Sequence, residues 1–139
     1  MDQSNGTMAE QIAQASSAFE RGRTGHAPKS VNVVLSGDTL VITLRGALSP
    51  AETTLARTPA GATRMQEFHR ELFAHSADPL LQEIKRITKV EVRESSAQLA
   101  TMTGAVMQLF ATGTVVQVFL LAGSVPADTW SGSGPGHPA

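Results

Sequence analysis

The sequence predicts a two-layer α+β fold, in which helices cover mainly one face of an antiparallel sheet of about four strands. Some segments carry apolar residues at helical spacing behind helix-capping signals, and others alternate apolar and polar residues as strands do. The chain has 139 residues, so we expect one domain, over residues 8–122. Residues 1–7 are predicted to be a flexible N-terminus. Residues 123–139, rich in Gly, Pro and Ser, are predicted to be a disordered tail.

The first helix is predicted over residues 8–22, because Thr7 and Glu10 have the spacing of a capping box. Its apolar face carries Met8, Ile12, Ala15 and Phe19. A connecting loop over residues 21–28 follows and ends at Pro28, which disfavours helical geometry in the residue before it.

A β-hairpin is predicted from residues 30–35 and 39–46, where valine, leucine and isoleucine alternate with other side chains. Gly37 lies between the two runs and can adopt the positive φ of a tight hairpin turn. The faces of this hairpin are mixed in polarity. They suit a sheet covered by helices on one face and by something less regular, for example a partner subunit, on the other.

Two further helices are predicted over residues 50–57 and 59–77. The segment Ser49–Glu52 supplies a capping serine, a proline at the first helical position and a glutamate at the third. The longer helix has an apolar stripe of Ala62, Met65, Phe68, Leu72 and Phe73. An Asp-Pro pair at 78–79 restarts or kinks this helix, and the apolar pattern then continues to Ile87.

The last part of the domain is predicted to hold two strands, a half-buried one over residues 89–93 and a central one over 113–122. Between them, residues 99–110 fit a helix loosely. No charged residue occurs from Ser95 to Ala127. A membrane span is not expected there, because polar side chains interrupt every stretch of membrane-spanning length. The absence of charge predicts burial together with a self-association face, and hence a homodimer.

Composition excludes several classes of protein. Without cysteine there is no disulfide, thiolate zinc site or cysteine nucleophile. Eleven basic and twelve acidic residues give a net charge of -1, and aromatic residues are few, so we expect no nucleic-acid partner. Phosphate-loop, dinucleotide-binding and metalloprotease motifs are absent from the sequence, and no cofactor or metal is expected. The polar N-terminus lacks signal-peptide order, which predicts a cytoplasmic protein, with peripheral attachment to a membrane as an option.

Two sets of residues are candidates for a site. A small anion could bind near the first loop and the long helix, at Arg21, Arg23, His26, Lys29, Arg64 and Arg70. Acid–base chemistry could use Glu52, Glu71, His69 or His75. Pairs such as Glu71 with His75 are also ordinary features of a solvated helix face, which is the interpretation favoured here.

The order of these segments resembles the MpsC family of small bacterial proteins, linked to Na⁺-translocating, membrane-potential-generating systems and to inorganic-carbon supply. The segments that carry the likeness are Gly25–Pro28, Leu48–Leu55, Arg64–Phe73, Lys89–Val90 and Val116–Leu121. Two departures indicate a divergent member: Gly25–Pro28 has alanine at position 27 where the family's Gly-x-Gly-Pro has glycine, and position 88 is threonine instead of glycine. The family brings no catalytic residues.

The resemblance implies a non-catalytic accessory or regulatory binding protein, linked to membrane ion or bicarbonate transport. Its partner would be a membrane transport protein or a small anion such as bicarbonate. Two alternatives remain open: a small acid–base enzyme that uses Glu or His residues of the long helix, and a homo-oligomeric assembly subunit.

Overall fold

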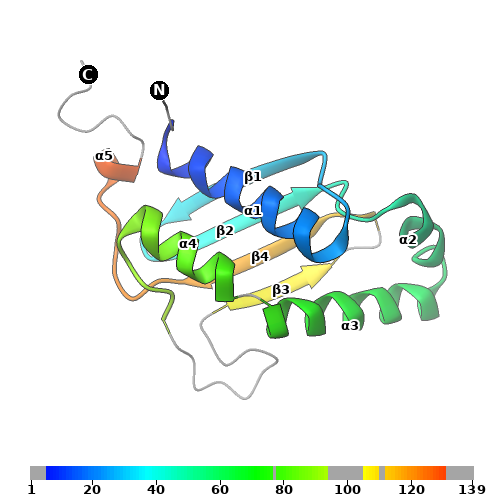
Figure 1. Ribbon diagram of the computed structural model, residues 1–139. Helices are drawn as coiled ribbons and strands as arrows, with labels where there is room; N and C mark the ends of the chain where they lie inside the picture. Colours follow the sequence, from blue (N-terminus) through cyan, green and yellow to red (C-terminus); the bar gives the residue numbers. More distant parts are fainter. Residues whose placement is uncertain (1–5, 77, 94–104, 110–111, 131–139) are drawn as a thin grey trace.

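The computed structural model describes residues 6–76, 78–93, 105–109 and 112–130 (Figure 1). Helices and strands follow along the chain as α1 (Met8–Thr24), β1 (Ser30–Ser36), β2 (Thr39–Arg45), α2 (Pro50–Leu55), α3 (Pro59–Ser76), α4 (Asp78–Thr88), β3 (Ala105–Leu109), β4 (Val115–Leu120) and α5 (Ala127–Trp130). The strands form an antiparallel sheet with helices packed against it, which confirms the α+β class.

The sheet has the strand order β1-β2-β4-β3, and every neighbouring pair is antiparallel. β1 and β2 form the predicted hairpin, in which Ser36 pairs with Thr39 across a two-residue turn. Gly37 has a φ of 63° in this turn, a left-handed conformation that glycine adopts without steric penalty. β2 and β4 are the central strands. The near-continuous apolar sequence of β4 fits this central position.

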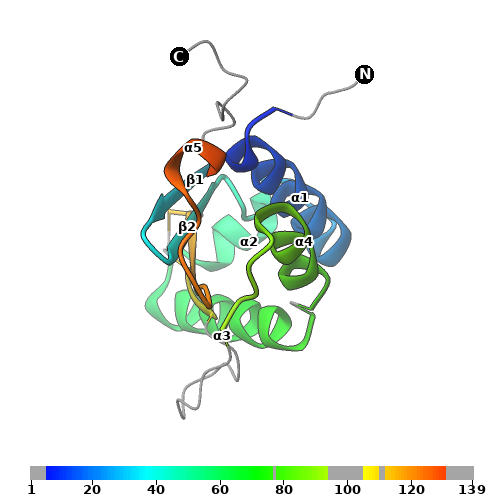
Figure 2. The same cartoon turned by 90° about the vertical axis from the view of Figure 1, so that its left-hand side faces the viewer.

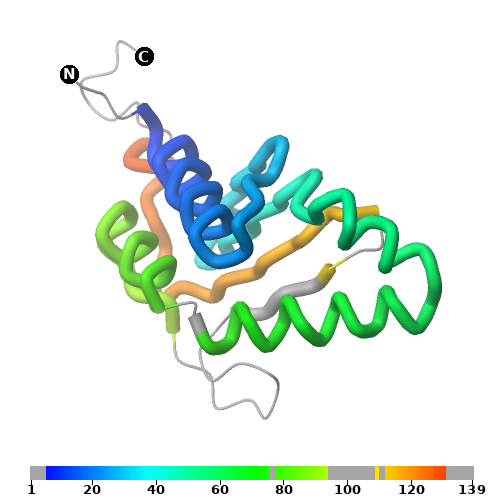
Figure 3. Tube along the Cα trace, turned by 45° about the vertical axis from the view of Figure 1, so that its right-hand side comes forward, coloured from blue at the N-terminus to red at the C-terminus, as the bar shows by residue number. Residues whose placement is uncertain are grey.

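One face of the sheet forms the core beneath the helices. Its side chains form three rows across β1, β2 and β4, namely Val31–Leu44–Val115, Val33–Ile42–Gln117 and Leu35–Leu40–Phe119. Helices α1 and α4 lie side by side over this face, and α3 lies along β3 (Figures 2 and 3). Phe73 of α3 meets Phe119 edge to face, with ring centroids 6.1 Å apart, so α3 shares the same core.

Local capping explains where the helices begin. At α1, the backbone N–H of Glu10 donates to Thr7 Oγ1 (3.1 Å), and the Thr7 N–H donates to Glu10 Oε1 (2.9 Å). At α2, the Glu52 N–H donates to Ser49 Oγ (3.3 Å), and the Ser49 N–H donates to Glu52 Oε1 (2.9 Å). Both capping boxes satisfy donors that a helix start otherwise leaves unpaired. Both predicted starts are therefore confirmed.

The strand predicted over residues 89–93 is wrong, because Val92 forms only an isolated bridge, with Leu121. Lys89 follows α4 with a φ of 67°, and this left-handed residue interrupts an extended path. Two backbone bonds still attach the segment to the end of β4. The Arg93 N–H donates to the Leu120 carbonyl (2.7 Å), and the Ala122 N–H donates to the Glu91 carbonyl (2.8 Å).

The helix predicted over residues 99–110 is also wrong where the structure describes it. Residues 105–109 form β3 and pair with β4, whereas 99–104 and 110 lie outside the described residues. Pairing with a β-rich neighbour decides the conformation of this segment, which local spacing alone left ambiguous. The prediction therefore placed three of the strands correctly and misplaced the fourth.

Both ends of the domain extend further than the sequence predicted. Thr7 belongs to the capping box of α1, and residues 1–5 lie outside the described part. In the segment predicted to be a disordered tail, Val125 is buried, and Trp130 of α5 packs against the core. The structure describes residues 123–130, which include α5, whereas 131–139 lie outside the described residues. Within the described part, no helix has the length and apolarity needed to cross a bilayer.

Candidate functional site

The six basic residues predicted to bind an anion fall into two groups. Arg21 and Arg23 lie in the last turn of α1, not in the predicted loop, and His26 and Lys29 follow the helix. Arg64 and Arg70 lie on α3. Within the described part of the chain, no hydrogen bond or ion pair joins the two groups. Anion binding by these residues stays a prediction.

Packing accounts for the positions of the first group. Arg23 forms an ion pair with Glu20, and both side chains are only 3% exposed. The Arg23 guanidinium also lies over the ring of Phe19, 5.1 Å from its centroid. His26 places Nε2 3.1 Å from the carbonyl oxygen of Gly46. Because carbonyl groups make the C-terminal end of a helix partly negative, the arginines in the last turn of α1 stabilise that end.

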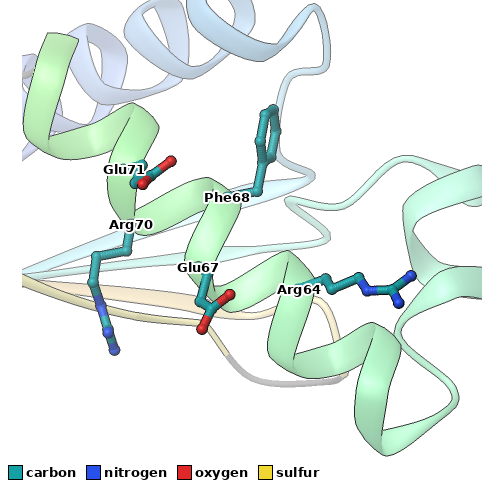
Figure 4. Close-up of a pocket in the computed structure, with 5 residues that line it drawn as sticks. All are labelled: Arg64, Glu67, Phe68, Arg70 and Glu71. Carbon is teal, nitrogen blue, oxygen red and sulfur yellow. The ribbon is translucent and has the colours of Figure 1, made fainter.

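The second group lines a surface pocket on α3 (Figure 4). Its lining consists of Arg64, Glu67, Phe68, Arg70 and Glu71, all from one helix. The side chains of Arg64 and Arg70 point in different directions in this view, with Glu67 between them and Glu71 above Arg70. The two arginines and two glutamates balance in charge, so this surface has no excess positive charge with which to hold an anion.

A buried Glu–His pair joins α2 to α3. Nε2 of His69 lies 3.1 Å from Oε2 of Glu52, and the side chains are 2% and 20% exposed, respectively. Burial raises the pKa of the Glu52 carboxyl, but hydrogen bonds from the Ser49 backbone N–H and from His69 outweigh burial and hold this pKa below its ordinary value. An ionised carboxylate can only accept, so Nε2 of His69 is the donor. Glu52 therefore both caps α2 and fastens it to α3.

The other two acid–base candidates do not join this pair. Glu71 and His75 are exposed on α3, as expected for a solvated helix face. A solvated position is wrong for His69, which is only 1% exposed. The apolar stripe predicted for this helix is wrong at Phe68, which is 50% exposed. The sequence did carry a signal for the buried histidine, because His69 lies four residues before Phe73 and so on the same helical face.

A metal centre is not supported by the described residues. They contain no group of three or more His, Asp or Glu side chains that could hold a metal ion. A ligand set of two, such as Glu52 with His69, leaves a structural or catalytic zinc site incomplete.

The second face of the sheet carries apolar side chains outside the core. It carries three further rows across β1, β2 and β4, namely Val34–Val41–Val118, Asn32–Thr43–Val116 and Ser36–Thr39–Leu120. We call these nine residues the open face. Val34 is 57% exposed, and the residues of β2 and β4 in these rows are half-buried. Among the described helices, α1 and α4 lie over the opposite side of the sheet, and α3 and α5 lie at its edges (Figure 2). A contiguous apolar surface of this kind is typical of an interaction site.

Comparison with known proteins identifies the family of the chain. Residues 4–114 match the family described as "Na+-translocating membrane potential-generating system (MpsC)", a span that runs from the start of α1 past β3. The chain is also similar to the uncharacterized protein YbcI of Bacillus subtilis (strain 168). The two are 24% identical over 110 residues, which cover 79% of this chain and 89% of that protein. No solved structure matches. Because the family match covers most of the chain, the protein belongs to the MpsC family.

Proposed function

We propose that the protein is a non-catalytic accessory or regulatory binding protein, linked to a membrane ion-transport system. The family description supports the link to Na⁺ translocation and membrane potential. The observation that carries the binding role is the open face, where apolar side chains of β1, β2 and β4 lie uncovered by any described helix or strand. Such a surface loses its contact with water only when another molecule packs on it.

The acid–base alternative is less well supported by the geometry. Of its four residues, only Glu52 and His69 meet, and the ring of His69 is nearly inaccessible to a substrate. A catalytic base works best when its pKa lies near the working pH, whereas the pKa of Glu52 is lowered. Both features favour a structural pair that joins two helices. The assembly-subunit alternative shares the open face with our proposal and differs only in what it binds.

The finer parts of the proposal concern partner and place. A membrane transport protein as partner, bicarbonate as ligand and peripheral attachment to the cytoplasmic side of a membrane all stay predictions. The family description supports only the first of them directly. If bicarbonate binds, the basic residues around the end of α1 are the expected position, apart from Arg23, whose buried guanidinium already pairs with Glu20.

Cells that lack the protein provide the test. We expect wild-type protein to restore Na⁺ efflux and membrane potential, measured with ²²Na⁺ and a voltage-sensitive dye. Val118→Lys, which places a charge in the middle of the open face, is expected to restore less than a tenth of the efflux. Val118→Thr keeps the β-branched shape and is expected to restore most of it.

Two controls separate binding from folding and from catalysis. Circular dichroism must show that Val118→Lys is as folded as Val118→Thr. Glu71→Gln and His75→Gln alter exposed acid–base candidates and should restore efflux fully. Full activity of Val118→Lys, or loss of activity in the two exposed variants, would contradict the proposal.

A further inference from the structure

The open face has no charge at its centre. Its middle row is Val34–Val41–Val118, and the two flanking rows contain only Asn, Ser, Thr, Val and Leu side chains. A surface without charge is complementary to a second copy of itself, because no like charges oppose each other when two copies meet. A charged partner surface has nothing to pair with at this centre.

Charges of opposite sign flank β2 at its two ends. Arg45, the last residue of β2, is exposed. Because alternate residues of a strand share a face, its side chain lies on the same side of the sheet as Val41 and Thr43, at the edge of the open face. It makes no ion pair within the described residues. Asp38 precedes β2, and its Oδ1 accepts a hydrogen bond from the Thr39 hydroxyl (3.3 Å), which places its carboxylate beside the open face. The strand thus runs from a negative to a positive end.

This polarity distinguishes two ways of stacking the face on itself. A two-fold axis parallel to the strands would bring Arg45 against Arg45 of the second copy. An axis in the interface perpendicular to the strands reverses β2, so that Arg45 of each copy meets Asp38 of the other. Only the second arrangement pairs opposite charges, and it does so twice because a two-fold interface repeats every contact.

We propose that the open face binds the open face of a second copy of this chain, with β2 crossing β2 in opposite directions and Arg45 of each copy opposite Asp38 of the other. The inference rests on the proposed binding role of the open face, and it names a second copy, in place of a transport protein, as the molecule that binds there. Sheets that pack in this way lie about 10 Å apart and within about 30° of alignment.

The size of the face sets the expected strength of the dimer. The three strands of the open face, about 4.8 Å apart and about 20 Å long, make a face of roughly 300 Å² per copy. This area is less than half of the roughly 800 Å² per partner of a standard interface, so the dimer is expected to be weak and reversible, with a Kd no tighter than the micromolar range.

Charge reversal with sedimentation velocity tests the arrangement. We expect the wild-type protein to pass from monomer to dimer between about 1 and 100 μM, and Val118→Lys to stay monomeric. Arg45→Asp or Asp38→Arg alone is expected to raise the Kd about tenfold, because each change creates two like-charge contacts. The double variant, Arg45→Asp with Asp38→Arg, should return to within about threefold of wild type, since both contacts regain opposite charges.

Arg57→Asp is the matched control. It changes the net charge as Arg45→Asp does, but Arg57 lies between α2 and α3, away from the open face, so its Kd should equal that of wild type. A wild-type monomer at 100 μM would overturn the inference. A dimer that persists in Val118→Lys, or a double variant weaker than both single variants, would overturn it as well.

The two proposals fail in different ways. If the protein is monomeric and Val118→Lys still fails in cells, the second copy is wrong and the open face serves another partner. If the dimer forms as described and Val118→Lys restores efflux, the inference stands and the proposed function is wrong.

Discussion

Gly61→Ala is expected to destabilise the protein by about 2–3 kcal/mol, because α2 and α3 approach each other too closely at this position for a side chain. A Cβ on Gly61 would overlap the backbone carbonyl oxygen of Leu55, the last residue of α2, and would lie 3.0 Å from Thr58 Oγ1. The carbonyl belongs to the backbone and cannot rotate away. The turn between the two helices must therefore open, which also strains the Glu52–His69 contact. Urea unfolding measures the loss.

Gly22 provides a matched control for this prediction. It lies in α1, and a Cβ built there meets no heavy atom within 4 Å. Gly22→Ala should stabilise the protein by about 0.5–1 kcal/mol, because alanine restricts the unfolded chain and favours helix. If the two alanine variants were equally stable, α2 and α3 would not be packed as described.

Glu52→Gln is expected to lower the free energy of unfolding by about 1 kcal/mol at neutral pH, since neutral hydrogen bonds replace charge-assisted ones. The folded pKa of Glu52 is lowered from 4.5, so the carboxylate stabilises the fold fully above this value. That contribution disappears as the pH falls through the lowered pKa. The difference between wild type and variant should therefore be largest above pH 4.5 and shrink steadily in more acid solution.

Glu71→Gln is the control, because Glu71 is an exposed carboxylate on the same helix and forms no ion pair among the described residues. It should change the free energy of unfolding by less than about 0.5 kcal/mol at any pH. A pH-independent difference for Glu52→Gln would show that the charge of Glu52 does not contribute to stability.

Local signals explain which parts of the fold could be predicted. Capping boxes at Thr7 and Ser49, and the turn at Gly37, depend on residues close together in the chain, and the structure has all three. The segment 105–109 depends on pairing with β4, and no local pattern reveals that partner. The segment 89–93 alternates like a strand, yet among the described residues it pairs with the end of β4 through one isolated bridge, which its two backbone hydrogen bonds form.

The candidate site was harder to predict for a similar reason. Basic residues near one another in sequence suggested an anion site, but Arg23 turns inward to Glu20, and the arginines of α3 alternate with glutamates. The contact between His69 and Glu52 spans two helices, so it depends on how these pack. By contrast, an uncovered sheet face could be foreseen, because strands with apolar residues on both faces need cover on both.

The open face also gives a physical reason for the distribution of charge in the sequence. Apolar residues on both sides of β4 are needed if one side meets the helices and the other meets a second chain. A charge on either side would be buried without a partner, which costs several kcal/mol in a dry interface. The central strand of this sheet therefore carries none.

Thiol cross-linking tests this account most directly, because the natural chain has no cysteine and a single introduced one is unique. In the proposed dimer, Val41 lies close to the two-fold axis, since the axis crosses β2 midway between Asp38 and Arg45. Backbones about 10 Å apart are too distant for a disulfide, so a short bifunctional thiol reagent is needed. We predict that Val41→Cys becomes a covalent dimer and that Glu71→Cys, on the outside of α3, stays monomeric. No cross-link at Val41, or equal cross-linking at both positions, would contradict the claim that a second copy covers this face.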